Sequence, residues 1–288
     1  SLLKFGKKIY KSKNLIMSAG VIGTMDLLLK QKYHYKTLPH LPIALGENLR
    51  TNSESLCAVT APKEKLNNGI AISSIFNPDA DTHVEVVKYP DGSNIMKILT
   101  TLAARPPFRV LKFFKNIIIH PVKVFKVLTD SDWAKKTIIF LIMQSLDNSM
   151  KIVCKTFPFF RLSIKNKGQN KVPSYIESGQ NLMGAYAEKI NGTQQNGISE
   201  LLLGMATTAH ILGGSPLGID KNTCVVNEKF QVHGQPNMMI LDGSIVPCNI
   251  GVNPSLTITA LSEYAMSLID KNDTYPTSLE DQLAAIPL

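Results

Sequence analysis

Residues 241–255 read Leu-Asp-Gly-Ser-Ile-Val-Pro-Cys-Asn-Ile-Gly-Val-Asn-Pro-Ser and join the end of a strand to the start of a helix. The predicted strand ends at Asp242, and Gly243 allows a ligand to approach the backbone. Asn253 is expected at the N-cap and Pro254 at the first helical position, ahead of a periodic apolar face. Free N–H groups at a helix start attract negative charge. The stretch therefore indicates a ligand site, or simply a strand, a loop and a well-capped helix.

A second strand–turn–helix unit lies near the start of the chain. Residues 13–18 predict a short buried strand, and residues 21–31 predict a helix with apolar side chains on one face. Between the two units the chain is rich in strands, which we expect to pair in an antiparallel sheet. These strands are predicted at residues 70–74, 82–89, 136–144, 151–156 and 160–164. Residues 146–149, Leu-Asp-Asn-Ser, are predicted to be the hairpin turn between the third and the fourth of them.

The order of these elements predicts a mixed α/β and α+β protein with two domains, the first interrupted by the second. Residues 1–52 and 206–288 are expected to build one α/β domain. Residues 53–205 are expected to build the other, with an antiparallel sheet and helices, of which two are predicted at residues 175–190 and 198–205.

Composition narrows the class of protein. Apolar residues make up 44% of the 288 residues, which suits a globular protein, and no apolar run is long enough for a transmembrane helix. The four cysteines are scattered and match no zinc or disulfide spacing, which favours a reducing compartment. Residues 1–20 show no secretory signal, so a cytoplasmic or peripheral membrane protein is expected.

The net charge of +9 is unevenly distributed. Residues 105–171 carry fourteen Lys or Arg against three Asp, whereas residues 172–288 carry four basic and eleven acidic residues. Within residues 105–126, six cations alternate with bulky apolar side chains at helical spacing. This pattern is typical of a helix on a membrane surface, or of an amphipathic helix packed on its own domain. Nucleic acid is not expected as a partner, because no binding motif accompanies the charge.

A histidine loop precedes the residues quoted first: residues 209–218 read Ala-His-Ile-Leu-Gly-Gly-Ser-Pro-Leu-Gly. His210 suits proton transfer near neutral pH, although such a loop is also typical of a structural turn with a hydrogen-bonded histidine. Ser215 is not a hydrolase nucleophile, because Leu217 breaks the G-x-S-x-G pattern and no histidine follows Asp242. The glycines never fall as G-x-G, so the chain contains no dinucleotide fingerprint.

Together these segments resemble the glucose–methanol–choline (GMC) oxidoreductases, and among them the bacterial cholesterol-oxidase-like branch. Residues 242–261 are similar to the closing signature of the family, and the loop at 210–218 is similar to its histidine loop. Residues 18–24, 45–49 and 50–54 are similar to a central segment of the family's FAD domain. The resemblance implies that residues 1–52 and 206–288 form part of a Rossmann-like FAD-binding domain, interrupted by the substrate domain.

The resemblance implies FAD as the cofactor and a sterol or another hydrophobic alcohol as the substrate, with molecular oxygen as the electron acceptor. It implies that His210 accepts the substrate hydroxyl proton and that Asn253 hydrogen-bonds the same oxygen. Glu85 lies in a segment loosely similar to the strand whose carboxylate shifts a steroid double bond, and is otherwise expected to be a solvated strand residue. Residues implied at the cofactor are Ser18, Ala19, Gly20, Asn52, Asp242, Gly243, Asn253 and Pro254.

The FAD phosphate loop of the family has no counterpart in this sequence. The resemblance therefore implies a C-terminal part of such an enzyme, with an N-terminal FAD-binding segment on the same or another polypeptide. It also implies that this chain alone binds FAD weakly. An inactive fragment, or a module that binds lipid without catalysis, is the alternative interpretation.

Overall fold

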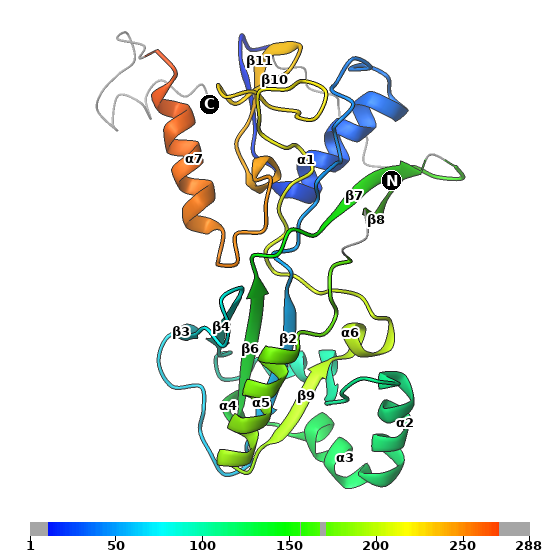
Figure 1. Cartoon of the computed structure of the whole chain (residues 1–288), viewed down its shortest axis with the longest axis vertical. Helices are drawn as coiled ribbons and strands as arrows, with labels where there is room; N and C mark the ends of the chain where they lie inside the picture. The colour runs from blue at the N-terminus through cyan, green and yellow to red at the C-terminus, as the bar shows by residue number, and fades with distance from the viewer. Residues whose placement is uncertain (1–10, 156, 168–170, 271–288) are drawn as a thin grey trace, which may run out of the picture.

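The computed structural model describes residues 11–155, 157–167 and 171–270, which form two lobes joined by a waist (Figure 1). The upper lobe in this view is built mainly from residues near both ends of the chain, and Met150, Ile152, Cys154, Phe160 and Leu162 from the middle of the chain also pack into its core. Its sheet has three strands in the order β1 (Leu15–Met17), β11 (Gln235–Ile240) and β10 (Gln231–Val232). β1 runs parallel to β11, and β10 runs antiparallel to it. Two segments that are far apart in the sequence therefore make one sheet.

α1 (Gly20–Leu29) packs in the upper lobe and continues as a π-helical turn, η1 (Lys30–His34). Apolar residues three or four positions apart lie on one face of a helix. Met25, Leu28 and Leu29 follow this spacing and are buried in the core of the lobe. The strand and the helix predicted near the start of the chain are confirmed, but the strand is not buried as predicted, because Leu15 and Ile16 are exposed.

The lower lobe contains an antiparallel sheet of six strands in the order β3–β4–β6–β2–β9–β5. Its strands are β2 (Ser55–Thr60), β3 (Ile72–Phe76), β4 (Thr82–Val87), β5 (Thr100–Leu102), β6 (Thr137–Gln144) and β9 (Thr193–Gly197). The predicted antiparallel pairing is confirmed, but β2, β5 and β9 were not predicted. β9 reads Thr-Gln-Gln-Asn-Gly and offers no apolar pattern, while β2 is buried along nearly its whole length and lacks alternation.

One face of this sheet carries Glu85. Residues directly opposite each other in an antiparallel sheet lie on the same face, so Glu85, Leu141 and Leu56 form one row across three strands. The buried tryptophan of α4 (Trp133–Lys136) and the methionine of the 3-10 helix η2 (Asn94–Leu99) pack against this face. The face is therefore largely apolar, although Glu85 and His83 of β4 both lie on it.

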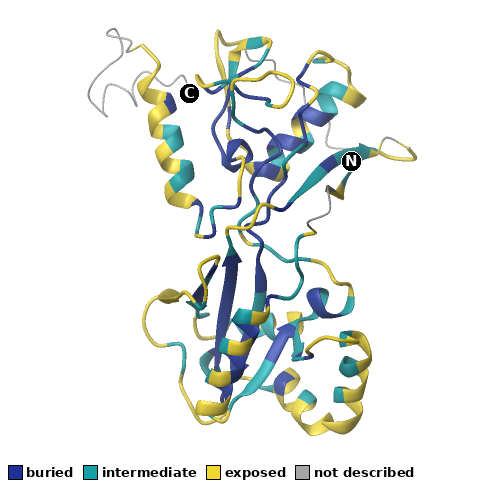
Figure 2. Ribbon diagram, viewed as in Figure 1, coloured by how far each residue is buried: buried dark blue, intermediate teal, exposed yellow. Residues whose placement is uncertain are grey.

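The opposite face of the sheet is covered by α5 (Glu177–Lys189), and the strands beneath it are buried (Figure 2). Val84, Ile142 and Cys57 point to this face and form a core cluster with the helix. A side chain at Gly179 would meet Ile142 Cδ1 at 2.3 Å, so glycine allows α5 to lie close to the sheet.

The remaining helices lie at the borders of the lobes. α2 (Arg109–Ile119) and α3 (Pro121–Thr129) form a helical hairpin, because proline begins α3 and cannot continue α2. α6 (Ile198–Leu202) is a short helix that contacts α2. α7 (Ser255–Ser267) stands beside the upper lobe with only Ala265 buried. No helix in the described ranges is long and apolar enough to cross a membrane.

Three chain segments lie side by side at the waist and exchange main-chain hydrogen bonds. The Arg50 amide donates to the Leu212 carbonyl over 2.7 Å, and the Leu212 amide donates back over 3.0 Å. On the other side, the amides and carbonyls of Leu49 and Met150 exchange bonds of 2.9 and 2.8 Å. The segment at residues 49–50 is thus the central one of the three.

The predicted hairpin turn at residues 146–149 is wrong. Both edges of β6 are already paired with β2 and β4, so the next strand cannot join it. Instead β7 (Ser149–Lys155) pairs with β8 (Arg161–Lys167) in a separate two-stranded sheet. Residue 156, at the end of the strand predicted there, lies outside the described residues. Residues 145–148 carry the chain through the waist, where Arg50 Nη1 lies 2.5 Å from the Asp147 carboxylate.

We expect Gly213→Ala to destabilise the protein far more than Gly204→Ala. Both glycines have a positive φ, +75° and +61°, so each alanine carries a backbone strain of about 1–2 kcal/mol. A Cβ at Gly213 would also lie 1.9 Å from the Asn48 carbonyl oxygen, whereas a Cβ at Gly204 meets nothing within 4 Å. Urea unfolding of the two variants measures the difference, expected at roughly 2 kcal/mol or more. Equal losses would contradict the close packing of the histidine loop on residue 48.

Candidate active site

The carboxyl ends of β1 and β11 meet at one edge of the upper sheet. Ser18 follows β1 directly, and its hydroxyl donates to the Leu241 carbonyl at the end of β11 over 2.9 Å. In parallel α/β sheets, ligands bind outside the carboxyl ends of the strands. The structure therefore brings together, at such an edge, five of the residues predicted near a cofactor: Ser18, Ala19, Gly20, Asp242 and Gly243.

Asp242 is held within the chain at this edge. Its Oδ2 accepts the Thr24 hydroxyl from α1 over 2.5 Å, and its Oδ1 accepts the Ser244 amide over 2.8 Å. A side chain at Gly243 would meet Leu212 Cδ2 and Ile258 Cδ1, each at 3.3 Å. Both residues thus serve local packing in this structure, and their contact with a cofactor stays a prediction.

His210 is paired with a buried carboxylate that the sequence analysis did not single out. Its Nδ1 contacts Glu54 Oε1, and Glu54 Oε2 accepts the Ala209 amide over 2.6 Å. The Glu54 side chain is fully buried and that of His210 is mostly buried. A carboxylate only accepts hydrogen bonds, so it selects the neutral imidazole tautomer with its proton on Nδ1. Nε2 then carries the lone pair, and it has no hydrogen-bond partner among the described residues.

Asn253 and Glu85 are in direct contact, although 168 positions separate them in the sequence. Asn253 Nδ2 donates to both Glu85 oxygens over 2.9 and 2.8 Å, and His83 Nε2 lies 3.1 Å from Glu85 Oε1. The interpretation of Glu85 as a solvated strand residue is wrong, because the residue is only 3% exposed. Asn253 Oδ1 is buried and has no hydrogen-bond partner in the described part of the chain. The pair therefore leaves one free acceptor at this position.

The predicted N-cap role of Asn253 is also wrong. α7 begins at Ser255, its N-cap residue is Pro254, and no side chain caps it. The Pro254 carbonyl accepts the Ile258 amide over 2.9 Å, which closes the first helical turn. The Asn253 side chain is instead oriented by the two bonds that its amide nitrogen donates to Glu85. The first N–H groups of α7 are left without a side-chain partner.

Asn52 and Glu54 connect the two halves of this site. Asn52 Oδ1 accepts the Gly251 amide over 2.7 Å, and its Nδ2 donates to the Val252 carbonyl over 2.8 Å, so Asn52 holds the loop that precedes Asn253. Glu54, two residues later, holds His210. Asn52 lies in the left-handed region at φ 57°, which asparagine tolerates better than most residues. Its predicted contact with a cofactor stays a prediction, since the side chain here positions the loop.

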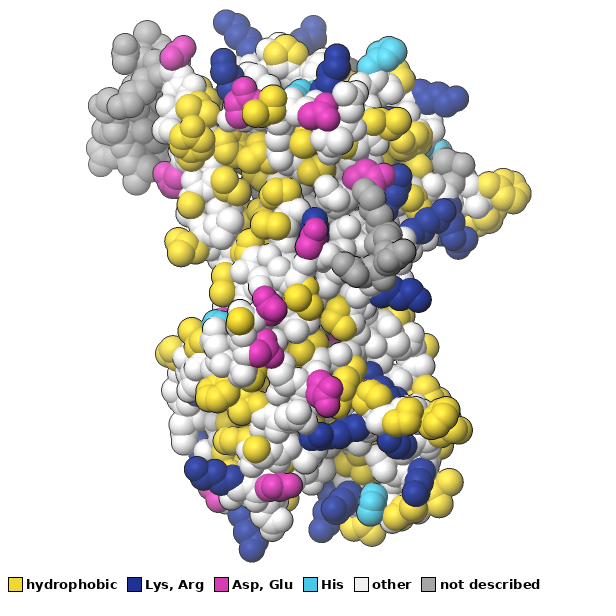
Figure 3. Space-filling model, viewed as in Figure 1, with side chains coloured by type: hydrophobic (Ala, Val, Ile, Leu, Met, Phe, Trp, Pro, Cys, Tyr) yellow, Lys and Arg dark blue, Asp and Glu magenta, His cyan; other side chains and the backbone are white. Residues whose placement is uncertain are grey.

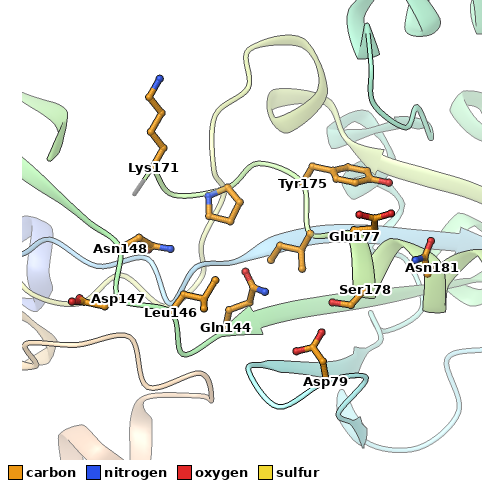
Figure 4. A pocket seen from close by; sticks show the side chains of 12 residues that line it. Asp79, Gln144, Leu146, Asp147, Asn148, Lys171, Tyr175, Glu177, Ser178 and Asn181 are labelled. Carbon is orange, nitrogen blue, oxygen red and sulfur yellow. The ribbon is translucent and has the colours of Figure 1, made fainter. Parts of the chain in front are cut away.

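Several cavities flank the six-stranded sheet, and two of them lie on its opposite faces. The larger one, about 940 Å³, runs from Asp147 and Asn148 at the waist to Glu177 and Asn181 of α5 (Figure 4). It lies on the α5 face and includes no predicted site residue. The smaller one, about 60 Å³, lies on the Glu85 face and is lined almost entirely by apolar groups: Leu56, Cys57, Ala58, Tyr89, Met96, Leu99, Thr100, Trp133, Ile139 and Gly197. The face that carries Glu85 therefore offers a small apolar cavity, which suits the apolar end of a substrate.

Glu54, His83 and Thr24 are the contacting residues that sequence reasoning missed. Glu54 lies in the segment 50–54 that the sequence analysis discussed, but a carboxylate next to Asn and Ser residues does not by itself indicate a contact with a histidine. His83 shares a face with Glu85 because the two are separated by two positions on a strand, and that spacing could have identified it. In the described ranges, no group of three or more His, Cys, Asp and Glu could hold a metal ion.

Comparison with known proteins assigns this site to a family. Residues 175–262 match the model of the GMC oxidoreductase C-terminal region. Those residues belong to the GMC oxidoreductase family. The GMC match includes His210 and Asn253, and GMC oxidoreductases act on alcohols.

Several known proteins are similar to this chain. A cholesterol oxidase from Acinetobacter baumannii is 33% identical over 284 residues, 96% of this chain and 50% of that protein. A cholesterol oxidase from Mycobacterium tuberculosis is 34% identical over 283 residues, 93% of this chain and 48% of that protein. The chain thus spans about half the length of these relatives.

A solved structure has a similar fold. The crystal structure of pyridoxine 4-oxidase from Mesorbium loti is similar with a TM-score of 0.51 and 13% identity, over 88% of this chain and 51% of that one. At this identity the likeness concerns the fold alone. The mixed α/β and α+β class predicted from the sequence is confirmed.

Glu200 of α6 is a further buried carboxylate beside the start of β2. Its Oε2 accepts the Ser55 hydroxyl over 2.8 Å, and its Oε1 accepts the Leu56 amide over 3.0 Å. Burial raises the pKa of Glu200 from its ordinary value of 4.5 to about 7, against the lowering effect of these hydrogen bonds. Glu200 therefore changes charge near neutral pH, and it is bonded to Ser55, the residue that follows Glu54.

The raised pKa of Glu200 predicts a pH-dependent stability. Its contribution is fully present below pH 4.5 and is lost as the pH rises through about 7, because the folded chain holds the proton that the unfolded chain releases. Relative to Glu200→Gln, the free energy of unfolding should fall by on the order of 3 kcal/mol across this window. Urea unfolding at a series of pH values measures it, with Glu263→Gln on the exposed side of α7 as the control. A constant difference between the chain and Glu200→Gln would contradict the shift.

Proposed function

We propose that this chain carries the substrate-handling residues of an FAD-dependent alcohol oxidoreductase that oxidises a sterol 3-hydroxyl to a ketone, with molecular oxygen as the acceptor. The observation that carries the proposal is the pairing of His210 with the buried Glu54 carboxylate. Glu54 lies two residues after Asn52, which holds the loop that precedes Asn253. The sterol part of the proposal rests on the similarity to proteins named cholesterol oxidase and on the apolar face around Glu85.

The residues present fit FAD on two observations. The Asn253 Oδ1 is a buried acceptor with no partner in the described residues, which suits the N–H donor of a flavin pyrimidine ring. The uncapped start of α7 offers free N–H groups and the positive end of a helix dipole, which suits the negative charge of a reduced flavin. FAD, when bound, supplies the hydride acceptor. The other residues proposed near it are Ser18, Ala19, Gly20, Asn52, Asp242, Gly243 and Pro254.

In this proposal His210 is the general base. Its Nε2 takes the proton of the substrate hydroxyl as the bond from carbon to hydrogen is broken. Glu54 stabilises the imidazolium that results, and it holds the ring because its second oxygen is anchored on the Ala209 amide. The base is thus oriented by a group that is itself fixed, which limits the motion of Nε2 relative to the substrate.

Asn253 and Glu85 are proposed to orient the substrate on the apolar face of the sheet. Glu85 fixes the Asn253 amide through two bonds, so the Oδ1 position is set by the strand rather than by the loop alone. The row of Glu85, Leu141 and Leu56 leads from this carboxylate to the small apolar cavity. At about 60 Å³ that cavity is smaller than the roughly 300 Å³ of a small ligand pocket. We infer that it takes only an apolar end of the substrate.

We expect His210→Gln to slow flavin reduction by a sterol alcohol by about 10²–10⁴ in the FAD-loaded enzyme that contains this chain, because a general base is lost. Glu54→Gln should also slow flavin reduction, because an amide does not enforce the tautomer in which Nε2 is free. Loss of the corresponding carboxylate severely slows hydrolytic triads. Flavin content should be unchanged in both. Stopped-flow reduction measures the rates, and His40→Gln on the exposed surface is the matched control. Reduction of the His210 variant at the parental rate would make His210 a structural residue.

Asn253→Leu should impair flavin reduction and also destabilise the fold, because it leaves the buried Glu85 carboxylate without its two amide bonds. The expected loss is about 2–3 kcal/mol in urea unfolding. In a Glu85→Leu background the same Asn253→Leu change should cost much less, since no carboxylate is then stranded. Additive losses in this cycle would contradict the contact.

Glu85→Gln should slow the shift of a steroid double bond more than it slows flavin reduction, which product analysis measures.

A further inference from the structure

The α2–α3 hairpin has an apolar face that packs on the lower lobe and a second apolar face that does not. Phe113, Ile117, Val124 and Val127 line a cavity of about 130 Å³ together with residues of β5 and α6, and so face inward. The outward side chains of the hairpin are large and exposed, with Phe108 and Ile118 the most exposed at 73% and 77%. They are Phe108, Leu111, Phe114, Ile118, Val122 and Phe125.

This outward set, the hairpin face, is continuous rather than scattered. Its four residues on and before α2 are spaced three or four positions apart, so they form one stripe along the helix. Single exposed apolar side chains are ordinary, whereas a contiguous patch marks an interaction site. The hairpin therefore packs on its own domain with one face and leaves the hairpin face available for an interaction.

Cations accompany the hairpin face, and acids do not. Residues 105–129 contain six Lys or Arg and neither Asp nor Glu. Lys115, Lys123 and Lys126 are exposed, and their aliphatic stems can lie along the apolar stripe while the ammonium groups reach outward. An apolar stripe bordered by lysines is the pattern of a helix that lies in the interface of an anionic membrane. A protein partner with mixed charges would not need such a one-sided surface.

A second exposed aromatic group lies at the tip of the β7–β8 sheet. Phe157 and Phe159 are 87% and 80% exposed, and Lys155 and Arg161 flank them. Figures 1 and 3 show that this tip and the α2–α3 hairpin project from the same side of the molecule, with apolar and basic side chains gathered at both. A flat surface can therefore touch both without passing through either lobe.

We propose that the chain docks on an anionic lipid bilayer through the hairpin face and the Phe157–Phe159 tip. The apolar side chains enter the headgroup boundary, and the lysines pair with lipid phosphates or carboxylates. Two contacts, one on each side of the waist, fix the orientation of both lobes relative to the bilayer. The proposal does not depend on catalysis, so it holds for the chain whether or not FAD is bound.

Sedimentation of the 288-residue chain with vesicles tests the proposal. Vesicles of phosphatidylcholine with phosphatidylserine should bind the chain, and added salt should weaken the binding. Each cation near such a surface is worth about a fivefold change in partitioning, so Lys115→Glu with Lys123→Glu should weaken binding by about 25-fold or more. Leu111→Ser with Ile118→Ser, and Phe157→Ser with Phe159→Ser, should each weaken it as well. Lys63→Glu with Lys65→Glu, in the exposed loop between β2 and β3, is the matched control and should bind normally.

Three results would overturn the proposal. Unchanged sedimentation of the hairpin variants, with circular dichroism melting like that of the parent, would mean that the face does not meet lipid. Concentration-dependent dimerisation in light scattering that Leu111→Ser with Ile118→Ser abolishes, without vesicle binding by the parent, would make the hairpin face a protein interface. An equal loss in the Lys63 and Lys65 control would reduce the effect to net charge and would also contradict the docking.

Discussion

The hydrogen bonding of the buried segment at residues 49–54 is the constraint on which the rest of the structure depends. Backbone groups removed from water must find partners in the protein, and this segment passes through the waist with nearly every residue buried. Its main chain is bonded to Leu212 on one side and Met150 on the other. Its side chains bond the 251–252 loop and His210. Neither lobe can shift at the waist without breaking several of these bonds.

The same constraint sets the chemistry of the site. His210 and Asn253 lie on loops, yet each is held by a buried residue of the waist or of a central strand. Carboxylates hold both: Glu54 selects the tautomer of the imidazole, and Glu85 fixes the amide. Polar groups buried with satisfied bonds are rigid, so the free Nε2 and the free Oδ1 are presented at defined positions. A loop-borne site gains in this way the precision of the scaffold beneath it.

The two proposals assign apolar surface two separate roles. Around Glu85 the apolar residues form a face inside the lower lobe, suited to a substrate that enters the protein. On the hairpin face they are exposed and bordered by lysines, suited to a surface outside it. Hydrophobicity alone does not distinguish the two, because the driving force is non-directional. Burial and neighbouring charge distinguish them.

Elements whose signal is local could be predicted from the sequence. The strand and helix near residue 20, the antiparallel middle and the start of a helix near Pro254 follow from periodicity and from proline, and His210 and Asn253 were singled out by their motifs. Which segments meet is a property of the tertiary structure. The periodicity of a strand does not identify its neighbours. The sequence therefore predicts that β6 pairs with β7, whereas in the structure it pairs with β2 and β4. Whether a carboxylate binds another side chain or water depends on its burial, which the sequence does not show. For that reason the contact of Glu54 with His210 and the contact of Glu85 with Asn253 were not predicted from the sequence.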